Sequence, residues 1–266
     1  MQPTSSADLI TRVAGIIWGD SKTGKTTWAM SLPGRKLLIN FDPDGYLSVA
    51  SRNDFDVLDL SVLPVGEQID QAKKAATYIV ENAAKYQSVI VDSITSLVMA
   101  AQSDAIIRGV GKSNTFQPSI DAPGLVAYGA RNGHTVDVVS KLLRATGINK
   151  QHCFFIAHAD DPEYDAKGEN IIKQTIMVSA KPRNSIALKV SEIYHLGLAS
   201  GNRRTVYTAP FGVLTPMGSR IFDTAKVPRF DLRYTIDKPD DQQPDSLTSI
   251  IAAFQKNKAK LTGVPK

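Results

Sequence analysis

Apolar runs and helical segments alternate along the first 160 residues. Short, nearly continuous apolar runs, which are typical of buried strands, lie at 13–18, 36–41, 56–60, 88–91 and 153–157. Segments whose apolar residues recur at helical spacing lie between them, at 26–32, 67–86, 94–108 and 125–144. Because helices that connect successive strands place those strands parallel, the pattern predicts an α/β fold, with a mostly parallel sheet flanked by helices.

The pattern changes after residue 159. A polar loop extends to residue 184, and strand-like runs then follow at 186–190, 192–198, 205–209 and 230–236, with Gly201-Asn202 as a hairpin turn. Short strands joined by tight turns pair in antiparallel fashion. We therefore expect antiparallel strands in the second half to extend the sheet.

The end of the chain differs in composition from both of the preceding regions. Residues 237–245 are rich in Pro and Asp and predict a linker, whereas 246–261 have the N-cap, apolar face and late lysines of a helix. The predicted organisation is one domain over 1–236, a linker over 237–245 and a basic C-terminal helix or tail over 246–266.

Composition excludes several classes of protein. Of the 266 residues, 42% are hydrophobic and 21% are charged, which is typical of a globular chain and not of a disordered or fibrous one. No apolar run approaches the roughly 20 residues that span a bilayer, so we expect no membrane association. The first ten residues lack the features of a signal peptide, and Cys153 is the only cysteine. These observations predict a cytoplasmic protein without internal disulfides.

The charge is distributed unevenly. The net charge is +5, and residues 181–238 hold ten Lys and Arg against four Asp and Glu. Bases on a surface usually serve only solvation, but a local excess also suits contact with a phosphate backbone or an arginine supplied across a subunit boundary. The main bases of this region are Lys181, Arg183, Lys189, Arg203, Arg204, Arg220, Lys226, Arg229 and Arg233.

One motif carries a definite chemistry. The sequence Gly19-Asp20-Ser21-Lys22-Thr23-Gly24-Lys25-Thr26-Thr27 satisfies the phosphate-loop pattern GxxxxGK[ST], between a predicted strand and a predicted helix. The glycines let backbone N–H groups wrap a phosphate, Lys25 neutralises the β- and γ-phosphates, and the Thr26 hydroxyl ligates Mg²⁺. Binding of a nucleoside triphosphate with Mg²⁺ is therefore the firmest expectation from the sequence, and the resemblance described below implies that this nucleotide is ATP.

Polar residues that follow other predicted strands belong to the same edge of a parallel sheet. Asp92 is placed to hold magnesium through water, although an acid at this position also serves as a helix cap. Asp42 and Asp44 either orient an attacking water or only form a turn. His158 either contacts the γ-phosphate or is a packed histidine.

Together these motifs resemble the RecA-type recombination ATPases, and most closely the short phage-encoded RecA-like proteins linked to single-strand annealing. The resemblance is carried by the phosphate loop, by Ile39-Asn-Phe-Asp-Pro-Asp-Gly45, by Val89-Ile-Val-Asp-Ser-Ile-Thr-Ser-Leu97 and by Phe154-Phe-Ile-Ala-His158. Further along, Met217-Gly-Ser-Arg220 resembles a basic motif of the short phage proteins. The resemblance implies a RecA-like P-loop NTPase core.

Carried over by position, the resemblance implies a role for each site residue. Lys25 and Thr26 serve phosphate and magnesium, and Asp92 serves the metal. Asp44 takes the place of the water-activating glutamate, and His158 that of the γ-phosphate sensor. Because aspartate is shorter than glutamate, we expect slow hydrolysis or the use of Asp42 instead, and histidine stands where glutamine is more usual.

The resemblance also implies partners. Two loops of the family face DNA, and here they correspond to 109–121 and 159–184; their candidate contacts are Lys112, Phe116, Lys167, Lys173, Lys181 and Arg183. Arg220 is the candidate for an arginine that acts across subunits. The implied assembly is a homo-oligomer, a ring or a filament, on single-stranded DNA. A single-stranded-DNA-binding protein is a candidate partner, and the location is the host cytoplasm if the chain is phage-encoded.

The resemblance implies a DNA-stimulated ATPase that acts in recombination or annealing. Other functions use the same protein core. One is a nucleotide-gated DNA-binding scaffold that hardly hydrolyses ATP, and another is a DNA translocase. A small-molecule P-loop kinase is the third, but the sequence contains no arginine-rich lid segment, and its long second half is unlike a compact kinase.

Overall fold

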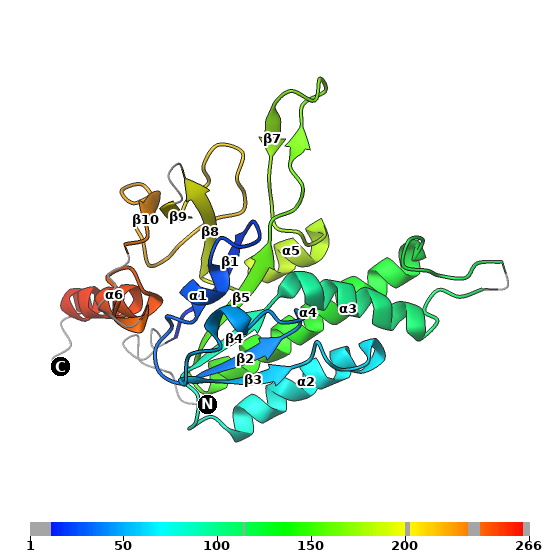
Figure 1. The fold of residues 1–266 in the computed structure, drawn as a ribbon, viewed down its shortest axis with the longest axis horizontal. Coiled ribbons are helices and arrows are strands. Elements are labelled where there is room, and N and C mark those ends of the chain that lie inside the picture. Colours follow the sequence, from blue (N-terminus) through cyan, green and yellow to red (C-terminus); the bar gives the residue numbers. More distant parts are fainter. Residues whose placement is uncertain (1–11, 114, 200–202, 234–239, 263–266) are drawn as a thin grey trace.

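The computed structural model of the chain describes residues 12–113, 115–199, 203–233 and 240–262, and these residues form an eight-stranded sheet with helices on both faces (Figure 1). The strands of this sheet are β1 (Ala14–Gly19), β2 (Lys36–Asn40), β3 (Phe55–Asp59), β4 (Ser88–Asp92), β5 (His152–His158), β8 (Glu192–Ala199), β9 (Arg203–Tyr207) and β10 (Arg229–Asp231). A separate hairpin pairs β6 (Glu163–Tyr164) with β7 (Ile171–Lys173).

The spatial order of the strands is β10-β9-β8-β1-β5-β4-β2-β3. All pairs from β8 to β3 are parallel, and the pairs β8–β9 and β9–β10 are antiparallel. This confirms the predicted α/β fold, a mostly parallel sheet that antiparallel strands extend. Because β5 lies between β1 and β4, the strand ends that carry Gly19, His158 and Asp92 meet at one edge.

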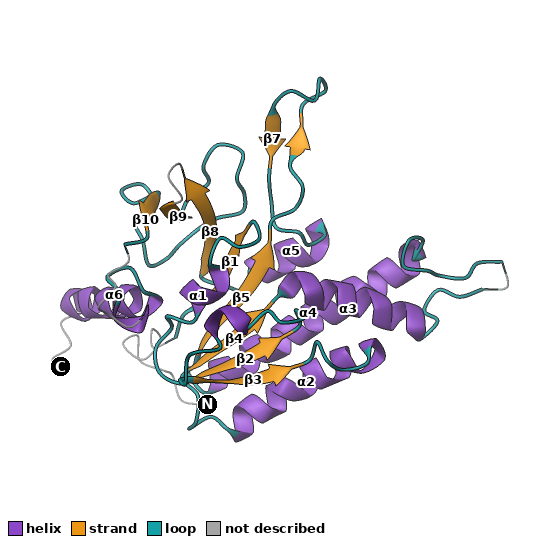
Figure 2. Ribbon diagram, viewed as in Figure 1, coloured by secondary structure: helices purple, strands orange, loops and turns teal. Residues whose placement is uncertain are grey.

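The helices form two layers (Figure 2). The helices are α1 (Lys25–Ala29), α2 (Val65–Glu81), α3 (Ile94–Ile107), α4 (Gly124–Ile148), α5 (Ala180–Ala187) and α6 (Leu247–Thr262), and there are short 3₁₀ turns η2 (Leu47–Val49) and η3 (Asp240–Gln242). α2, α3, α4 and α5 belong to one layer, and α1, η2 and α6 to the other. Among the described residues, none of the helices has the length and apolar content needed to cross a bilayer.

Neighbouring residues of the strands pack into two separate hydrophobic clusters. Leu37 and Ile39 of β2 join the cluster under α2, where Ile69 is fully buried. Leu38, between them, joins the cluster that contains Trp28 of α1 and Leu247 of α6. Successive strand side chains point to opposite faces, so a continuous apolar run identifies a strand that is covered on both sides.

The region after β5 differs from its prediction. The polar loop at 159–184 contains the β6–β7 hairpin and the start of α5, and the strand expected at 186–190 is wrong, because α5 continues to Ala187. Ile186 is 1% exposed on the buried side of this helix, and so short an apolar run does not distinguish a helix from a strand. β8 is a strand as expected, but it pairs with β1 in parallel. The turn at Gly201-Asn202 and residues 234–236 lie outside the described residues.

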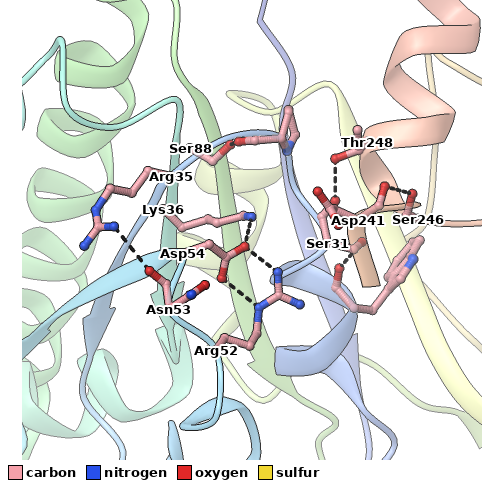
Figure 3. A network of polar contacts seen from close by, with 12 residues as sticks. Ser31, Arg35, Lys36, Arg52, Asn53, Asp54, Ser88, Asp241, Ser246 and Thr248 are labelled. Atoms are coloured by element: carbon pink, nitrogen blue, oxygen red, sulfur yellow. Dashed lines mark hydrogen bonds and ion pairs between the residues drawn. The ribbon is translucent and has the colours of Figure 1, made fainter. Parts of the chain in front are cut away.

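The helix expected at 246–261 is confirmed by α6, and its first turn is built into the core. Leu247 is fully buried, and Ile251 is 2% exposed. In Figure 3 Thr248 lies beside Ser31, and its hydroxyl donates a hydrogen bond of 2.7 Å to the Ser31 carbonyl. The division into domain, linker and tail stays a prediction, but the start of this helix is anchored to the segment that follows α1.

Candidate active site

The phosphate loop connects β1 to α1, and its shape depends on its glycines. Gly24 has φ 94°, and a Cβ atom there would lie 2.7 Å from Nε of Arg204. Gly19 also has a positive φ, and a Cβ atom there would meet the carbonyl oxygen of Leu196. Larger residues are excluded at both positions by backbone strain and by close neighbours. The loop therefore has no side chain at these two positions, which lets its backbone approach a bound phosphate.

Lys25 lies inside this loop. Its side chain is 5% exposed, and Nζ donates a hydrogen bond of 2.6 Å to the carbonyl oxygen of Asp20. Burial lowers the pKa of Lys25, while the negative charges of Asp92, Asp20 and Asp42 act to raise it. The amino group of Lys25 is therefore within electrostatic reach of three carboxylates, at the position where the motif puts phosphate.

Thr26 and Asp92 form the expected metal pair. The Thr26 hydroxyl donates to Oδ2 of Asp92 at 2.7 Å. Asp92 ends β4 and is 3% exposed; burial raises its pKa to about 6, against the Thr26 hydrogen bond, and the charge of Asp42 adds to the rise. The capping role belongs to its neighbour, because Ser93 Oγ accepts from the Ser96 N–H at 3.1 Å. Burial of the charged Asp92 carboxylate is energetically unfavourable without a partner. A carboxylate next to a hydroxyl suits an Mg²⁺ site, because proteins bind Mg²⁺ through few carboxylates together with nucleotide phosphates.

The structure separates the two aspartates that follow β2. Asp42 points to the site, where its Oδ2 lies 3.6 Å from Nε2 of His158 and its Oδ1 accepts from the Ser96 hydroxyl. Burial alone would raise the pKa of Asp42, but the hydrogen bonds from His158 and Ser96 outweigh it, and the pKa lies below its ordinary value. Asp44 is exposed in the turn, with φ 57°. Of the two, Asp42 is the carboxylate that the fold brings to His158 and Ser96.

His158 ends β5, opposite Gly19 in the parallel register. Its backbone N–H donates to the Thr95 hydroxyl at 3.0 Å, and its side chain is 33% exposed. The imidazole therefore lies between the phosphate loop and the Asp92 strand and contacts Asp42. This geometry suits a polar group that responds to the terminal phosphate.

The structure adds two polar contacts to the loop that no sequence pattern predicts. Nε of Arg204, on β9, donates to the Thr23 carbonyl at 3.0 Å, and the Gln174 amide donates to Oδ1 of Asp20 at 3.3 Å. Arg204 belongs to the basic region of the sequence, but no local pattern indicates that β9 returns beside the phosphate loop. The charge distribution therefore draws attention to Arg204, but it does not predict the position of this residue beside the phosphate loop.

The other candidate residues do not gather at the phosphate loop. Lys112 and Phe116 lie in the connection between α3 and α4, and Lys167 and Lys173 lie on the β6–β7 hairpin, which projects from the body in Figure 1. Lys173 is paired with Glu163. Lys181 and Arg183 belong to α5, and Arg220 is exposed in the loop before β10. Their roles toward DNA or a neighbouring subunit stay predictions.

Comparison of the sequence with known families agrees with this geometry. Residues 11–212 match the family AAA_24, which is described as an AAA domain. The chain belongs to this AAA domain family. It is thus a P-loop NTPase, and the family assigns it ATP binding and an ATPase activity, for which Mg²⁺ is the usual metal. No curated protein matches the chain.

The family match supports a broader statement than the resemblance found in the motifs. It covers the phosphate loop, Asp42, Asp92 and His158, and it identifies an AAA domain without identifying a recombination ATPase or a phage annealing protein. ATP and the P-loop fold are therefore established at family level, and the process that the AAA domain serves is a matter for proposal.

Proposed function

We propose that this AAA domain is an ATPase that acts on single-stranded DNA, in recombination or annealing, as a homo-oligomer. The observation that carries the catalytic part is the meeting of Lys25, Thr26, Asp92, Asp42 and His158 at one sheet edge. The DNA part is supported by two projecting segments. One is the α3–α4 connection, at the end of the helix that follows the Asp92 strand β4, and the other is the β6–β7 hairpin, which follows the His158 strand β5.

Hydrolysis needs a group that orients water and a site that stabilises charge. Lys25 exchanges its Asp20 carbonyl partner for phosphate oxygens, and the loop N–H groups hold the phosphate chain. Asp42 is ionised, because its pKa lies below the ordinary value, and it accepts the hydrogen bond of the attacking water. Ser96 and His158 hold its carboxylate in place. When bound at Thr26 and Asp92, Mg²⁺ neutralises the charge that develops on the phosphates.

A backbone connection joins this site to the hairpin. The N–H of Met177 donates to the carbonyl of His158 at 2.9 Å, and the N–H of Asp160 donates to the carbonyl of Thr175 at 2.7 Å. Residues at both ends of the hairpin are thereby bonded at the end of β5. A shift of His158 when the γ-phosphate leaves would move the base of the hairpin, which supports a role for nucleotide in controlling the DNA contact.

The test is the steady-state ATPase rate with and without single-stranded DNA, together with DNA binding at several salt concentrations. We expect stimulation by DNA, and an affinity that falls steeply with salt because Lys and Arg release counterions from phosphates. Replacing Lys167→Ala, on the hairpin, weakens DNA binding, whereas Lys74→Ala, on the exposed side of α2, serves as the matched control. Absence of both stimulation and DNA binding at low salt contradicts the DNA role.

Subunit assembly is part of the same proposal. Arg220 is exposed, and its backbone N–H is fixed by Oε1 of Glu192 at 3.1 Å, so its position in the loop is defined. Light scattering with Mg·ATP or a nonhydrolysable analogue is expected to show an oligomer. Arg220→Ala is then expected to lower the ATPase rate without lowering ATP affinity. A fully active monomer contradicts assembly and the trans-acting arginine together.

A further inference from the structure

A fully buried carboxylate lies at the end of the sheet opposite the phosphate loop. Glu192 begins β8 and is 0% exposed, and in the parallel register it lies opposite Gly15, near the start of β1. Among the described residues, no basic side chain forms an ion pair with it. Burial raises the pKa of Glu192, and hydrogen bonds from neutral groups act against this. A buried carboxylate without a cation is energetically unfavourable, so its contacts require an explanation.

Two of the donors to this carboxylate come from one loop, residues 216–222, called here the Arg220 loop. The hydroxyl of Tyr194, on β8 itself, donates to Oε2 of Glu192 at 2.6 Å. The Ser219 hydroxyl donates to the same oxygen, and the Arg220 N–H donates to Oε1 at 3.1 Å. Ser219 Oγ also accepts from the N–H groups of the two residues after Arg220, at 3.1 and 3.0 Å. Glu192 and Ser219 together therefore fix three successive N–H groups of the loop.

The Arg220 loop is attached to the sheet at two further points. Gly218 exchanges two backbone hydrogen bonds with Ile193 of β8, at 2.8 and 3.0 Å. The Trp18 Nε1–H donates to the carbonyl of Pro216 at 3.0 Å. Trp18 belongs to β1 and directly precedes the phosphate loop. The backbone of the Arg220 loop is therefore fixed both to β8 and to the strand that leads into the phosphate site.

The side chain of Arg220 is not held in this way. It is exposed, and its guanidinium forms no hydrogen bond or ion pair with any residue that the structure describes. Other bases of the same region are neutralised within the chain by ion pairs, namely Arg203 with Asp231, Lys226 with Asp223 and Arg233 with Asp245. A fixed backbone with an unpaired guanidinium suits contact with an anion that another molecule supplies.

The contacts of Glu192 require a group that only accepts hydrogen bonds. Ser219 Oγ already accepts two N–H groups, so its own proton is donated to Glu192. The Arg220 N–H can also only donate. A glutamine would place an NH₂ group at one of the two carboxylate oxygens and would oppose one of these donors. Glu192→Gln therefore disturbs the support of the Arg220 loop while the size of the side chain stays the same.

We propose that Glu192 is a positioning residue for Arg220. Its carboxylate holds the Arg220 loop on β8 in the conformation from which the guanidinium reaches a triphosphate bound by a neighbouring subunit. The inference rests on the trans-acting arginine of the proposed function, and it extends that role to a buried residue that touches neither nucleotide nor metal. It also explains why a carboxylate is buried here without a cation.

The first test is the steady-state ATPase rate of the assembled full chain. Glu192→Gln is expected to lower kcat about tenfold, because a displacement of about 1 Å is enough to weaken a transition-state contact. KM for ATP should stay within about twofold of wild type, because the phosphate loop of the same subunit is untouched. Arg220→Ala should lower kcat further, because it removes the charge itself.

Ser219→Ala is a second, milder variant, because Ser219 is only half-buried and its loss leaves the core in place. It should lower kcat about three- to tenfold, again with little change in KM. The matched control is Ser191→Ala. The Ser191 hydroxyl, one residue before Glu192, donates to the Ala14 carbonyl at 3.0 Å and not to the Arg220 loop. This control should retain the wild-type rate.

Mixing of subunits separates positioning from damage to the subunit's own site. Lys25→Ala subunits lack turnover but keep an intact Arg220 loop. Added in excess to Glu192→Gln subunits, they supply a correctly placed arginine to an intact phosphate site, and turnover per Glu192→Gln subunit should rise at least about threefold. Subunits that carry both Lys25→Ala and Arg220→Ala should give no rise.

The outcomes distinguish this inference from the proposal on which it rests. A wild-type rate in Arg220→Ala contradicts the trans-acting arginine, and the positioning role with it. A loss in Arg220→Ala together with wild-type rates in Glu192→Gln and Ser219→Ala overturns the positioning role alone. A loss in Glu192→Gln that excess Lys25→Ala subunits do not relieve also overturns it, because the defect then lies within the subunit's own site.

Discussion

The phosphate end of the site and the contact between α1 and the segment before α6 are built in different ways. At the phosphate end, Lys25, Asp92 and His158 lie at or just after strands whose apolar runs are visible in the sequence. The contact instead joins Trp28 to Asp245, which is 217 residues later in the chain. The difference teaches that chemistry placed at parallel strand ends can be read from local motifs. A site formed by the packing of a distant segment cannot be predicted from local motifs.

The largest effect is expected at the phosphate end. Lys25→Ala removes the ammonium group that meets the phosphates, and the ATPase rate is expected to fall by about 10²–10³-fold. The sheet and its clusters do not depend on Nζ, so circular dichroism and the unfolding temperature should stay close to wild type. Lys74→Ala, an exposed lysine on α2, controls for loss of one positive charge. Unchanged turnover in Lys25→Ala contradicts the site assignment.

The next prediction uses the two neighbouring aspartates. Asp42→Asn is expected to lower kcat about 100-fold, because the amide cannot accept the proton of an attacking water. Asp44→Asn should change kcat by less than about twofold, because Asp44 is exposed and Asp42 holds the place beside His158. Phosphate release under saturating ATP measures both. The reverse order would assign the water to Asp44, as the family resemblance implies.

In the C-terminal region, Leu247→Ala tests how much the first turn of α6 contributes to the free energy of unfolding. Its side chain is fully buried against the α1 layer, so the free energy of unfolding should fall by about 2–5 kcal/mol. Leu188→Ala is the matched control, because Leu188 is 87% exposed. Urea unfolding measures both variants. Equal stabilities would mean that the first turn of α6 contributes nothing to the core.

The smallest effect concerns Asp92 and pH. Its folded pKa of about 6 lies above the ordinary 3.8, so the folded chain keeps this proton up to about pH 6 while the unfolded chain loses it near pH 4. The contribution of Asp92 to the free energy of unfolding therefore falls as pH rises from 4 to 6. Above pH 6 the buried carboxylate is ionised, and its full destabilising effect is present. Asp92→Asn should raise the free energy of unfolding by about 1–3 kcal/mol at pH 8.

The same variant separates stability from binding. In the wild-type chain Mg²⁺ with ATP should raise the unfolding temperature at pH 8, and less so below pH 6, where Asp92 is protonated. Asp92→Asn should lose the part of this rise that depends on Mg²⁺. Thermal unfolding with ATP, with and without Mg²⁺, measures it. A variant that is less stable than wild type at pH 8 contradicts the buried-charge explanation.

Much of the fold was predictable, for a physical reason. Strands covered on both faces give continuous apolar runs, as in Val89-Ile90-Val91, where alternate side chains enter different clusters. The helices between them have apolar residues at helical spacing. The prediction was wrong at 186–190, because Ile186 belongs to the buried side of α5 and a short apolar run has no periodicity that excludes a helix.

The sequence by itself determined the phosphate loop, the parallel α/β core and the placement of Asp92 and His158 at one edge. These features follow from local spacing, because the ends of parallel strands converge. Only the tertiary structure decided that Asp42 and not Asp44 contacts His158, that Arg204 returns to the phosphate loop, and that the segment before α6 is bonded to α1. These depend on how a turn is directed and how distant segments pack, and neither has a local signature in the chain.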